Sequence, residues 1–303
     1  MSHEHIEASV KSCYSTWGQT YYDEYYGDKA SYPPVHKELV RQELLKAGAI
    51  TVLDAGCGPA SMLRDLAGDG FDLYGFDLTP EMVTEAKRVL DERGIPADHI
   101  WEGSVLAADA FRGPGPGAPR QFDAAICFGV FPHIPAETDA IVLRHLRDAV
   151  KPGGLVAVEA RNQLFALFTL NRYSHELFFD ELIRAQPLKQ RAGDDLTALE
   201  KGLHELRTRF RMDLPSVRTG NADEPGYDEV LSRTHNPLVM TQQMQQAGFA
   251  DVQMLFYHFH CLPPMLQGFV PQLFVKESVA MEDPTDWRGY FMASAFVVTG
   301  KRT

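Results

Sequence analysis

Short apolar runs alternate with helical stretches over the segment 50–160. Helix-like stretches, notably 80–93 and 137–151, separate the runs. Strands that alternate with helices of this length are typical of βαβ units, in which helices cover both faces of a parallel sheet. The runs that we expect to form strands are 51–54, 73–77, 99–102, 122–127 and 154–159.

The alternation stops after the fifth run and resumes near residue 237. In between, apolar residues recur at helical spacing from Phe165 to Ile183, and another helical stretch lies around 195–211. A helix over 238–247 and strands over 252–260 and 291–299 then continue the first pattern. These changes of period predict three regions. They are a tyrosine-rich helical cap of residues 1–35, a core of residues 36–160 and 237–303, and a helical lid of residues 161–236 inserted after the fifth strand.

Composition narrows the class of protein. The 303 residues carry a net charge of −12, which argues against nucleic acid or an anionic membrane as the main partner, since both favour a basic face. We expect no membrane-spanning helix, because no apolar run reaches ~18 residues. The four cysteines lie far apart in the sequence, which indicates reduced thiols and neither disulfides nor a metal cluster. The N-terminus lacks the apolar region of a signal peptide. A cytoplasmic protein is therefore expected, and a homodimer is left open.

A glycine-containing turn follows the first predicted strand. Gly56 and Gly58 allow a tight turn and close approach of a ligand to the backbone. Asp77 ends the next strand 21 residues after Gly56, where a carboxylate can accept the two hydroxyls of a ribose. Asp54 would repel a pyrophosphate but suits an ammonium, and Ser61 replaces the third glycine of a dinucleotide site. S-adenosylmethionine, with its ribose and amino acid and no phosphate, therefore fits better than NAD.

Several motifs, each weak alone, occur in a characteristic order over residues 52–160. One of them, Lys151-Pro-Gly-Gly154, directly precedes the fifth predicted strand. With them the sequence resembles the class I S-adenosylmethionine-dependent methyltransferases, close to the small-molecule branch, well over 50–160 and loosely over 237–300. The resemblance implies a Rossmann-like, mostly parallel sheet of seven strands. The motifs are VLDAGCGPA (52–60), GFDLTPEMV (75–83), EGSVLAAD (102–109), FDAAICFGVFPHI (122–134) and LRDAVKPGGLVAVEA (146–160).

The resemblance also implies roles toward the cofactor. The turn at Gly56 and Gly58 would hold the methionine portion, Asp54 its ammonium and Asp77 the ribose. Ser104 stands where relatives often have an aspartate that accepts a hydrogen bond from the adenine amino group. The carboxylate of Asp109 could make this contact instead. Four further residues are expected around the cofactor. They are Leu78 and Met82 beside the adenine, Val105 at its edge and Phe128 on the methionine side.

The aromatic N-terminal segment contains Trp17 and five tyrosines. In related methyltransferases this segment closes over the cofactor, and an aromatic face favours a sulfonium cation. We expect Tyr22 to contact the cofactor. The alternative is an aromatic stripe that packs against the edge of the sheet.

Ligands of open parallel sheets bind at the carboxyl ends of the strands, so polar residues there are candidates for acceptor chemistry. His258 and His133 are candidate general bases for a hydroxyl acceptor; the alternative is that each is a core histidine with backbone partners. His258 and His260 are expected on one face of their strand, with Tyr257 and Phe259 on the other. No third residue lies at a spacing that would complete a metal site with His258 and His260, so we expect no metal at this pair. The candidate substrate contacts are Arg161, Asn162, Arg172, Tyr173 and His260.

The expected function is transfer of a methyl group from S-adenosylmethionine to a small molecule, leaving S-adenosylhomocysteine. An oxygen acceptor is the first choice, because histidines near the strand ends can take the proton of a hydroxyl. The alternatives are methylation of nitrogen or carbon, and a non-catalytic protein that binds the cofactor.

Overall fold

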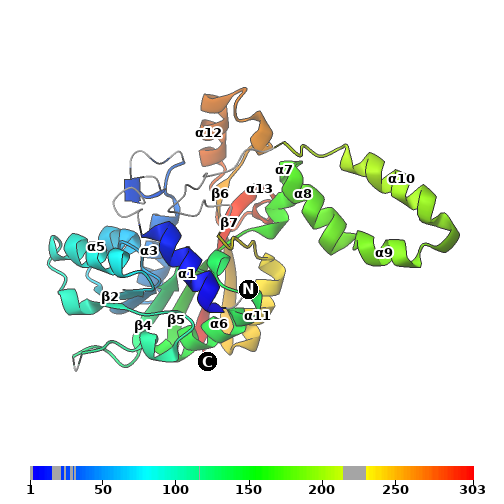
Figure 1. Cartoon of the computed structure of the whole chain (residues 1–303). Helices are drawn as coiled ribbons and strands as arrows, with labels where there is room; N and C mark the ends of the chain where they lie inside the picture. Colours follow the sequence, from blue (N-terminus) through cyan, green and yellow to red (C-terminus); the bar gives the residue numbers. More distant parts are fainter. Residues whose placement is uncertain are drawn as a thin grey trace.

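Seven strands form one sheet in the order β3-β2-β1-β4-β5-β7-β6 (Figure 1). The computed structural model describes residues 3–15, 22–23, 25–27, 30, 32–115, 117–213 and 230–303. The strands are β1 (Thr51–Ala55), β2 (Asp72–Asp77), β3 (Ile100–Glu102), β4 (Phe122–Cys127), β5 (Val150–Arg161), β6 (Phe249–Phe259) and β7 (Ala293–Arg302).

The sheet is mostly parallel. Strands β3, β2, β1, β4 and β5 pair in parallel, and β7 lies antiparallel between β5 and β6. The predicted Rossmann-like sheet of seven strands is therefore confirmed. Because the parallel strands all end at one edge, the loops after β1, β2 and β4 meet there, where a ligand can reach several of them.

Helices cover both faces of the sheet. On one face α3 (His36–Lys46), α4 (Ser61–Leu66) and α5 (Pro80–Asp91) share a buried cluster with residues of the strands. On the other, α6 (Asp139–Ala149) and α11 (Pro237–Gln246) do so. Further helices are α1 (His3–Tyr14), α12 (Pro271–Ala280) and α13 (Gly289–Met292), of which α13 packs against the second cluster through Tyr290 and Met292.

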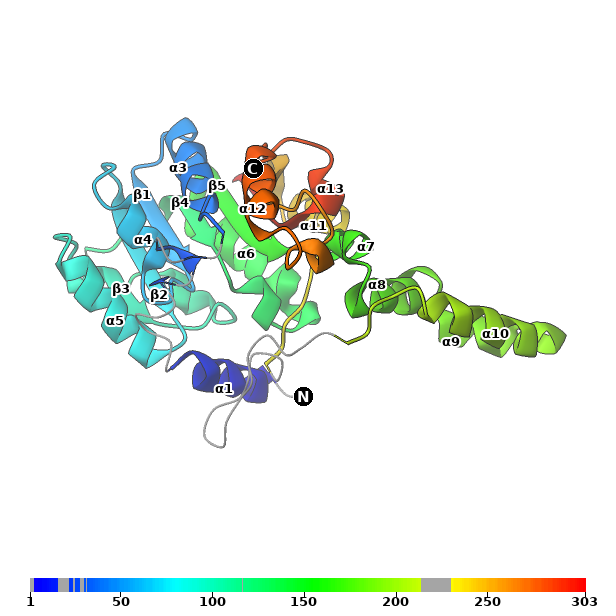
Figure 2. The same ribbon diagram turned by 90° about the horizontal axis from the view of Figure 1, so that it is seen from above.

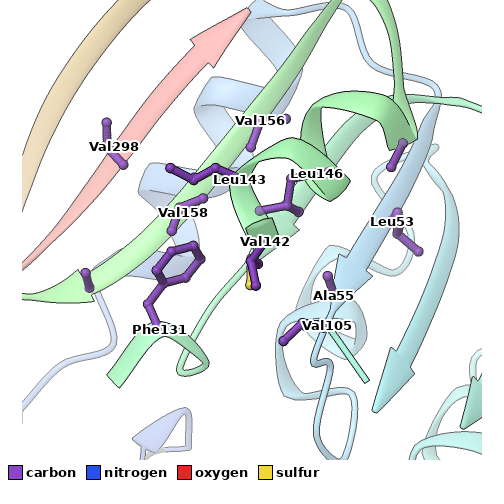
Figure 3. Packing of buried hydrophobic residues seen from close by; sticks show 14 of the residues in the cluster. Leu53, Ala55, Val105, Phe131, Val142, Leu143, Leu146, Val156, Val158 and Val298 are labelled. Carbon is purple, nitrogen blue, oxygen red and sulfur yellow. The ribbon is translucent and has the colours of Figure 1, made fainter. Parts of the chain in front are cut away.

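The core follows the two periodicities of the sequence. On α6, Val142, Leu143 and Leu146 recur at helical spacing, and each is fully buried. They pack on Val156 and Val158, which share one face of β5 because strand side chains alternate. Figure 3 shows these contacts between helix and sheet. Burial of this apolar surface fixes the strand ends that surround the candidate site.

The segment between β5 and α11 is helical where it is described. After α7 (Ala166–Thr169), residues 172–210 form a helical arm. Asn171 caps its first helix by accepting a hydrogen bond from Tyr173 N at 3.0 Å. A parallel bridge between Asn171 and Arg211 closes the base of the arm, which projects away from the sheet in both views (Figures 1 and 2). The arm contains α8 (Arg172–Glu176), a π-helical turn (Leu177–Leu182), α9 (Ala185–Arg191) and α10 (Leu196–Arg207).

None of the described helices combines the length and hydropathy needed to cross a membrane.

Candidate active site

A cavity of about 120 Å³ lies at the carboxyl ends of β1, β2 and β4. We call it the first cavity. It brings together residues that lie far apart in the sequence, because parallel strands end at the same edge. Among its lining residues are most of those predicted to bind the cofactor. These are Asp54, Gly56, Gly58, Asp77, Leu78, Met82, Ser104, Val105 and Phe128.

The turn after β1 has a backbone that favours glycine. Gly56 has φ +85°, and a Cβ there would lie 2.3 Å from Val130 Cγ2. Gly56 N and Cys57 N both donate to Phe76 O, at 2.8 and 2.9 Å. A side chain at position 56 would therefore push the loop after β4 away from the turn. Glycine lets the two loops close together around the first cavity.

Two carboxyl groups at the strand ends contribute to the acidic character of the first cavity. Asp54 is 2% exposed, and no described residue hydrogen-bonds its Oδ1. Burial and the neighbouring Asp77 raise the pKa of Asp54 to about 8. The Asp77 carboxylate accepts from Gly58 N and Thr79 N, both at 2.8 Å, while burial raises its pKa. An unpaired buried carboxyl suits a cationic group. The ammonium and ribose of S-adenosylmethionine fit this pair.

The N-terminal helix α1 adds residues that the sequence did not single out. Glu7 and Val10 line the first cavity, and Glu7 Oε1 accepts a hydrogen bond from Ser104 Oγ at 2.5 Å. Asp109, which we considered as a partner for adenine, is exposed and does not line the cavity. No periodic signal could have joined residue 7 to residue 104, since only the packing of α1 brings them together.

A second cavity, of about 790 Å³, adjoins the first. Aromatic side chains and imidazoles make up much of its wall, with Glu159 and Arg161 as its charged residues. It contains three of the predicted acceptor-side residues besides Arg161, namely His133, His258 and His260. The residues shared by the two cavities are Tyr14, Tyr26, Phe128, Gly129 and His133.

His133 lies at the junction with both ring nitrogens hydrogen-bonded. Nδ1 lies 2.7 Å from Leu231 O, so it carries the proton, and Nε2 therefore accepts from the Tyr14 hydroxyl at 2.9 Å. Burial, followed by the charge of Arg161, lowers the pKa of His133 to about 4. A base at this position would act through Tyr14, which lines both cavities.

The three remaining imidazoles of the second cavity are His36, His258 and His260. Burial lowers their pKa values to about 3, 4 and 3, so all are neutral at pH 7. No described residue hydrogen-bonds the ring nitrogens of His260, which are buried. The His258 ring packs against the Tyr32 ring in a tilted arrangement, with ring centroids 4.0 Å apart.

The predicted alternation along β6 is wrong at one step. Tyr257 lines the second cavity together with His258 and His260, while Phe259 packs in the opposite core with Phe256. The cause is the left-handed backbone of His258, at φ +61°. One residue in this conformation resets the alternation of faces. Because such a conformation is unfavourable for a non-glycine residue, the surrounding packing must hold it in place.

Glu159 is a buried acid in the second cavity that our list of site residues lacked. Its Oε2 accepts from Gly129 N at 2.8 Å, and its Oε1 accepts from the Tyr257 hydroxyl at 3.1 Å. It therefore ties the loop after β4, shared by both cavities, to β6. The sequence did carry a signal for this residue, because Glu159 is an acidic residue near the carboxyl end of the predicted fifth strand, where ligands bind.

Two predicted contacts lie outside both cavities because their polar groups have other partners. The Tyr22 ring packs under Arg64, and its hydroxyl donates to Asp65 at 3.1 Å. Tyr14 and Tyr26 take the place at the cavity that we expected for Tyr22. Asn162 is 3% exposed, and its side-chain amide donates to Gly289 O, Tyr290 O and Ala293 O. Asn162 therefore joins the end of β5 to α13.

Two further predicted substrate contacts, Arg172 and Tyr173, lie on the helical arm. Arg172 Nη2 donates to the Tyr173 hydroxyl at 3.0 Å, and neither residue lines a cavity. No described residue of the arm lines either cavity. Of the predicted lid, the described arm of residues 172–210 therefore lines neither cavity, whereas Arg161, the first residue of the predicted lid, lines the second.

Comparison with known proteins identifies the domain. A family model described as a methyltransferase domain matches residues 52–154. The chain is similar to a ubiquinone biosynthesis O-methyltransferase of Xanthomonas euvesicatoria pv. vesicatoria, at 32% identity over 45% of this chain and 53% of that one. A protein of the same description from Pseudomonas paraeruginosa is 28% identical over 67% of this chain and 75% of its own. The chain thus spans about half the length of the Xanthomonas relative.

The crystal structure of magnesium protoporphyrin IX methyltransferase from Synechocystis PCC 6803 has the same fold. It aligns over 98% of this chain and 100% of its own, with a TM-score of 0.51 and 16% identity. Residues 52–154 thus belong to a methyltransferase domain family, and the chain shares the fold of this methyltransferase, which confirms the resemblance to the class I S-adenosylmethionine-dependent methyltransferases seen in its motifs.

Proposed function

We propose that this protein transfers a methyl group from S-adenosylmethionine to an oxygen atom of a small-molecule acceptor. The observation that carries the proposal is the pair of adjoining cavities. One is acidic and the other aromatic, and they meet at Tyr14, Phe128 and His133. The relatives described as O-methyltransferases support oxygen as the acceptor atom.

The first cavity would hold the cofactor, which supplies an electrophilic methyl group on its sulfonium. Asp54 would pair with the ammonium and Asp77 with the ribose hydroxyls. The turn at Gly56 would let the backbone approach the methionine portion. Tyr14, Tyr26 and Phe128 would offer aromatic faces to a cation near the junction. These residues position the donor, and positioning can supply much of the rate enhancement of a displacement.

The second cavity would hold the acceptor. His258 is our candidate for the general base, because its ring is neutral at pH 7 and lines the second cavity. Its nitrogen would take the proton of the acceptor hydroxyl as the oxygen bonds to the methyl carbon, and the carbon–sulfur bond would break to leave a neutral thioether. His133 is the second candidate and would act through Tyr14.

The wall of the second cavity indicates the acceptor class. Aromatic side chains and neutral imidazoles favour a planar, largely apolar molecule. Arg161 would bind a carboxylate or phosphate on it, and His260 would offer a ring nitrogen to a polar group. A homodimer, a cytoplasmic location and the absence of a nucleic-acid partner remain predictions from the sequence, and sedimentation of the purified protein measures the first.

The test is methyl transfer from S-adenosylmethionine with a ¹³C-labelled methyl group to a panel of phenols, catechols, aromatic acids and aromatic amines. We expect a labelled methoxy group or methyl ester in the product, identified by its carbon chemical shift. Label on nitrogen or carbon would contradict the choice of oxygen. Binding of S-adenosylhomocysteine without turnover of any acceptor would favour the non-catalytic alternative. If calorimetry detects no binding of either form of the cofactor, the proposal fails.

A further inference from the structure

Helix α1 brings a carboxylate to the wall of the first cavity. Glu7 lines this cavity together with Gly103, Ser104 and Val105, which follow β3. The Ser104 hydroxyl donates to Glu7 Oε1 at 2.5 Å and accepts from Leu106 N at 3.1 Å. The proton of Ser104 is therefore committed to Glu7, and the carboxylate is held in place. A carboxylate has about four lone-pair positions, so Glu7 keeps capacity to accept from a ligand.

The surroundings of Glu7 define which ligand group it suits. Leu78, Met82 and Val105 line the same cavity, and Met82 and Val105 are 3% and 8% exposed. Apolar walls of this kind favour a planar ring, and a carboxylate at its edge requires a hydrogen-bond donor. The exocyclic amino group of adenine is such a donor. Hypoxanthine carries a carbonyl oxygen at the same position. This oxygen is also an acceptor, so its lone pairs would repel those of the Glu7 carboxylate.

We propose that Glu7 accepts a hydrogen bond from the exocyclic amino group of the cofactor's adenine and so makes the protein selective for that base. The inference rests on the proposed function, because it assumes that S-adenosylmethionine occupies the first cavity. It also assigns a recognition role to a residue outside the matched domain at residues 52–154. Ser104 orients the Glu7 carboxylate through its hydroxyl.

The proposal has a consequence for α1 as a whole. The same helix carries Val10, which lines the first cavity, and Tyr14, which lies between the two cavities. An adenine bound to Glu7 would hold α1 against the core, with Tyr14 in its place beside His133. Binding of the cofactor should therefore slow hydrogen exchange at the amides of α1.

The experiment compares S-adenosylhomocysteine with S-inosylhomocysteine, which differs at this edge of the base, by titration calorimetry. We expect the unmodified protein to bind the adenine compound at least about tenfold more tightly, since a hydrogen bond to a charged group is replaced by a repulsive contact. In Glu7→Gln the ratio should fall toward one, because an amide can donate to the inosine carbonyl. Glu4→Gln is the matched control, because Glu4 is exposed on the same helix and lines neither cavity.

The outcomes separate this inference from the function on which it rests. Equal affinity of the unmodified protein for both compounds overturns the assignment of Glu7, whatever the variants do. A full preference for adenine in Glu7→Gln overturns it as well. A lack of binding of S-adenosylhomocysteine to the unmodified protein defeats both the proposed function and the inference. If α1 exchanges equally fast with and without S-adenosylhomocysteine, the role of the helix is wrong.

Discussion

Asp54 is the residue whose state depends most directly on the ligand. Its buried carboxyl lies near Asp77, and the pKa of Asp54 is about 8, so the free protein holds a proton there at pH 7. A carboxyl in the unfolded chain loses its proton near pH 4. Between these values the folded state binds the additional proton, so the free energy of unfolding without ligand should fall as the pH rises.

Pairing with the cofactor's ammonium should ionise Asp54. At pH 7 we therefore expect binding of S-adenosylhomocysteine to release about one proton, because an opposite charge favours the carboxylate. Calorimetry in phosphate and in Tris measures the number released from the difference in observed enthalpy. Asp54→Asn should abolish the release and weaken binding. The same enthalpy in both buffers for the unmodified protein would contradict this protonation of Asp54.

His258 carries the prediction on pH dependence. Burial lowers the pKa of this imidazole to about 4, and a protonated ring cannot accept the acceptor's proton. With S-adenosylmethionine saturating, so that Asp54 is already paired, kcat/KM for the acceptor should therefore stay level down to about pH 5 and fall near pH 4, below the usual histidine range. His258→Gln should reduce kcat about 100-fold or more. His204→Gln is the control, because His204 is exposed on α10 and lines neither cavity.

Two results would count against His258. An acid limb near pH 6.5 would show that the reacting base is a solvated imidazole, contrary to the burial of this one. Unchanged turnover in His258→Gln would remove the residue from the chemistry and leave His133, acting through Tyr14, as the remaining candidate.

At the scale of the elements, local pattern predicted the strands best. The apolar run 122–127 coincides with β4, and β1 and β2 begin within one residue of the predicted starts. Their periodicity is a property of neighbouring residues and can be read locally. The break in alternation at His258 could not be read this way, since packing on both sides of β6 holds its left-handed backbone.

The N-terminal segment, which contains helix α1, shows the same limit of what local sequence pattern can predict. Tyr22 was expected to contact the cofactor, but Tyr14 and Tyr26 line the first cavity, whereas Tyr22 stacks under Arg64. An aromatic residue carries the same local signal whether it packs on an arginine or faces a cavity. The choice depends on where α1, residues 22–23 and residues 25–27 pack against the core, which involves residues distant in the sequence.

At the scale of the whole molecule, the helical arm of residues 172–210 stands apart from the two cavities. Its base is closed by the bridge between Asn171 and Arg211, with a hydrogen bond of 3.0 Å from Arg211 N to Leu170 O. The core clusters are built without it. The arm is therefore an element that can be removed without opening the core.

Replacement of residues 173–209 by a short Gly-Ser linker should leave the affinity for S-adenosylhomocysteine within about threefold of the original. The reason is that no described residue of this span lines the first cavity. Calorimetry measures the affinity, and thermal unfolding of the same variant shows whether the core is intact. A large loss of affinity in a variant that still unfolds cooperatively would mean that the arm does act on the cofactor side.

The sequence by itself determined the layered α/β architecture, the turn at Gly56 and the acids Asp54 and Asp77 at the strand ends. These features depend on local periodicity and on backbone conformations that few residue types adopt. The tertiary structure decided which residues meet across long separations: Glu7 with Ser104, Tyr14 with His133, and Glu159 with Gly129 and Tyr257. These pairs depend on how α1, β5 and β6 come together at the carboxyl end of the sheet, and that arrangement is held by burial of apolar residues from the whole length of the chain.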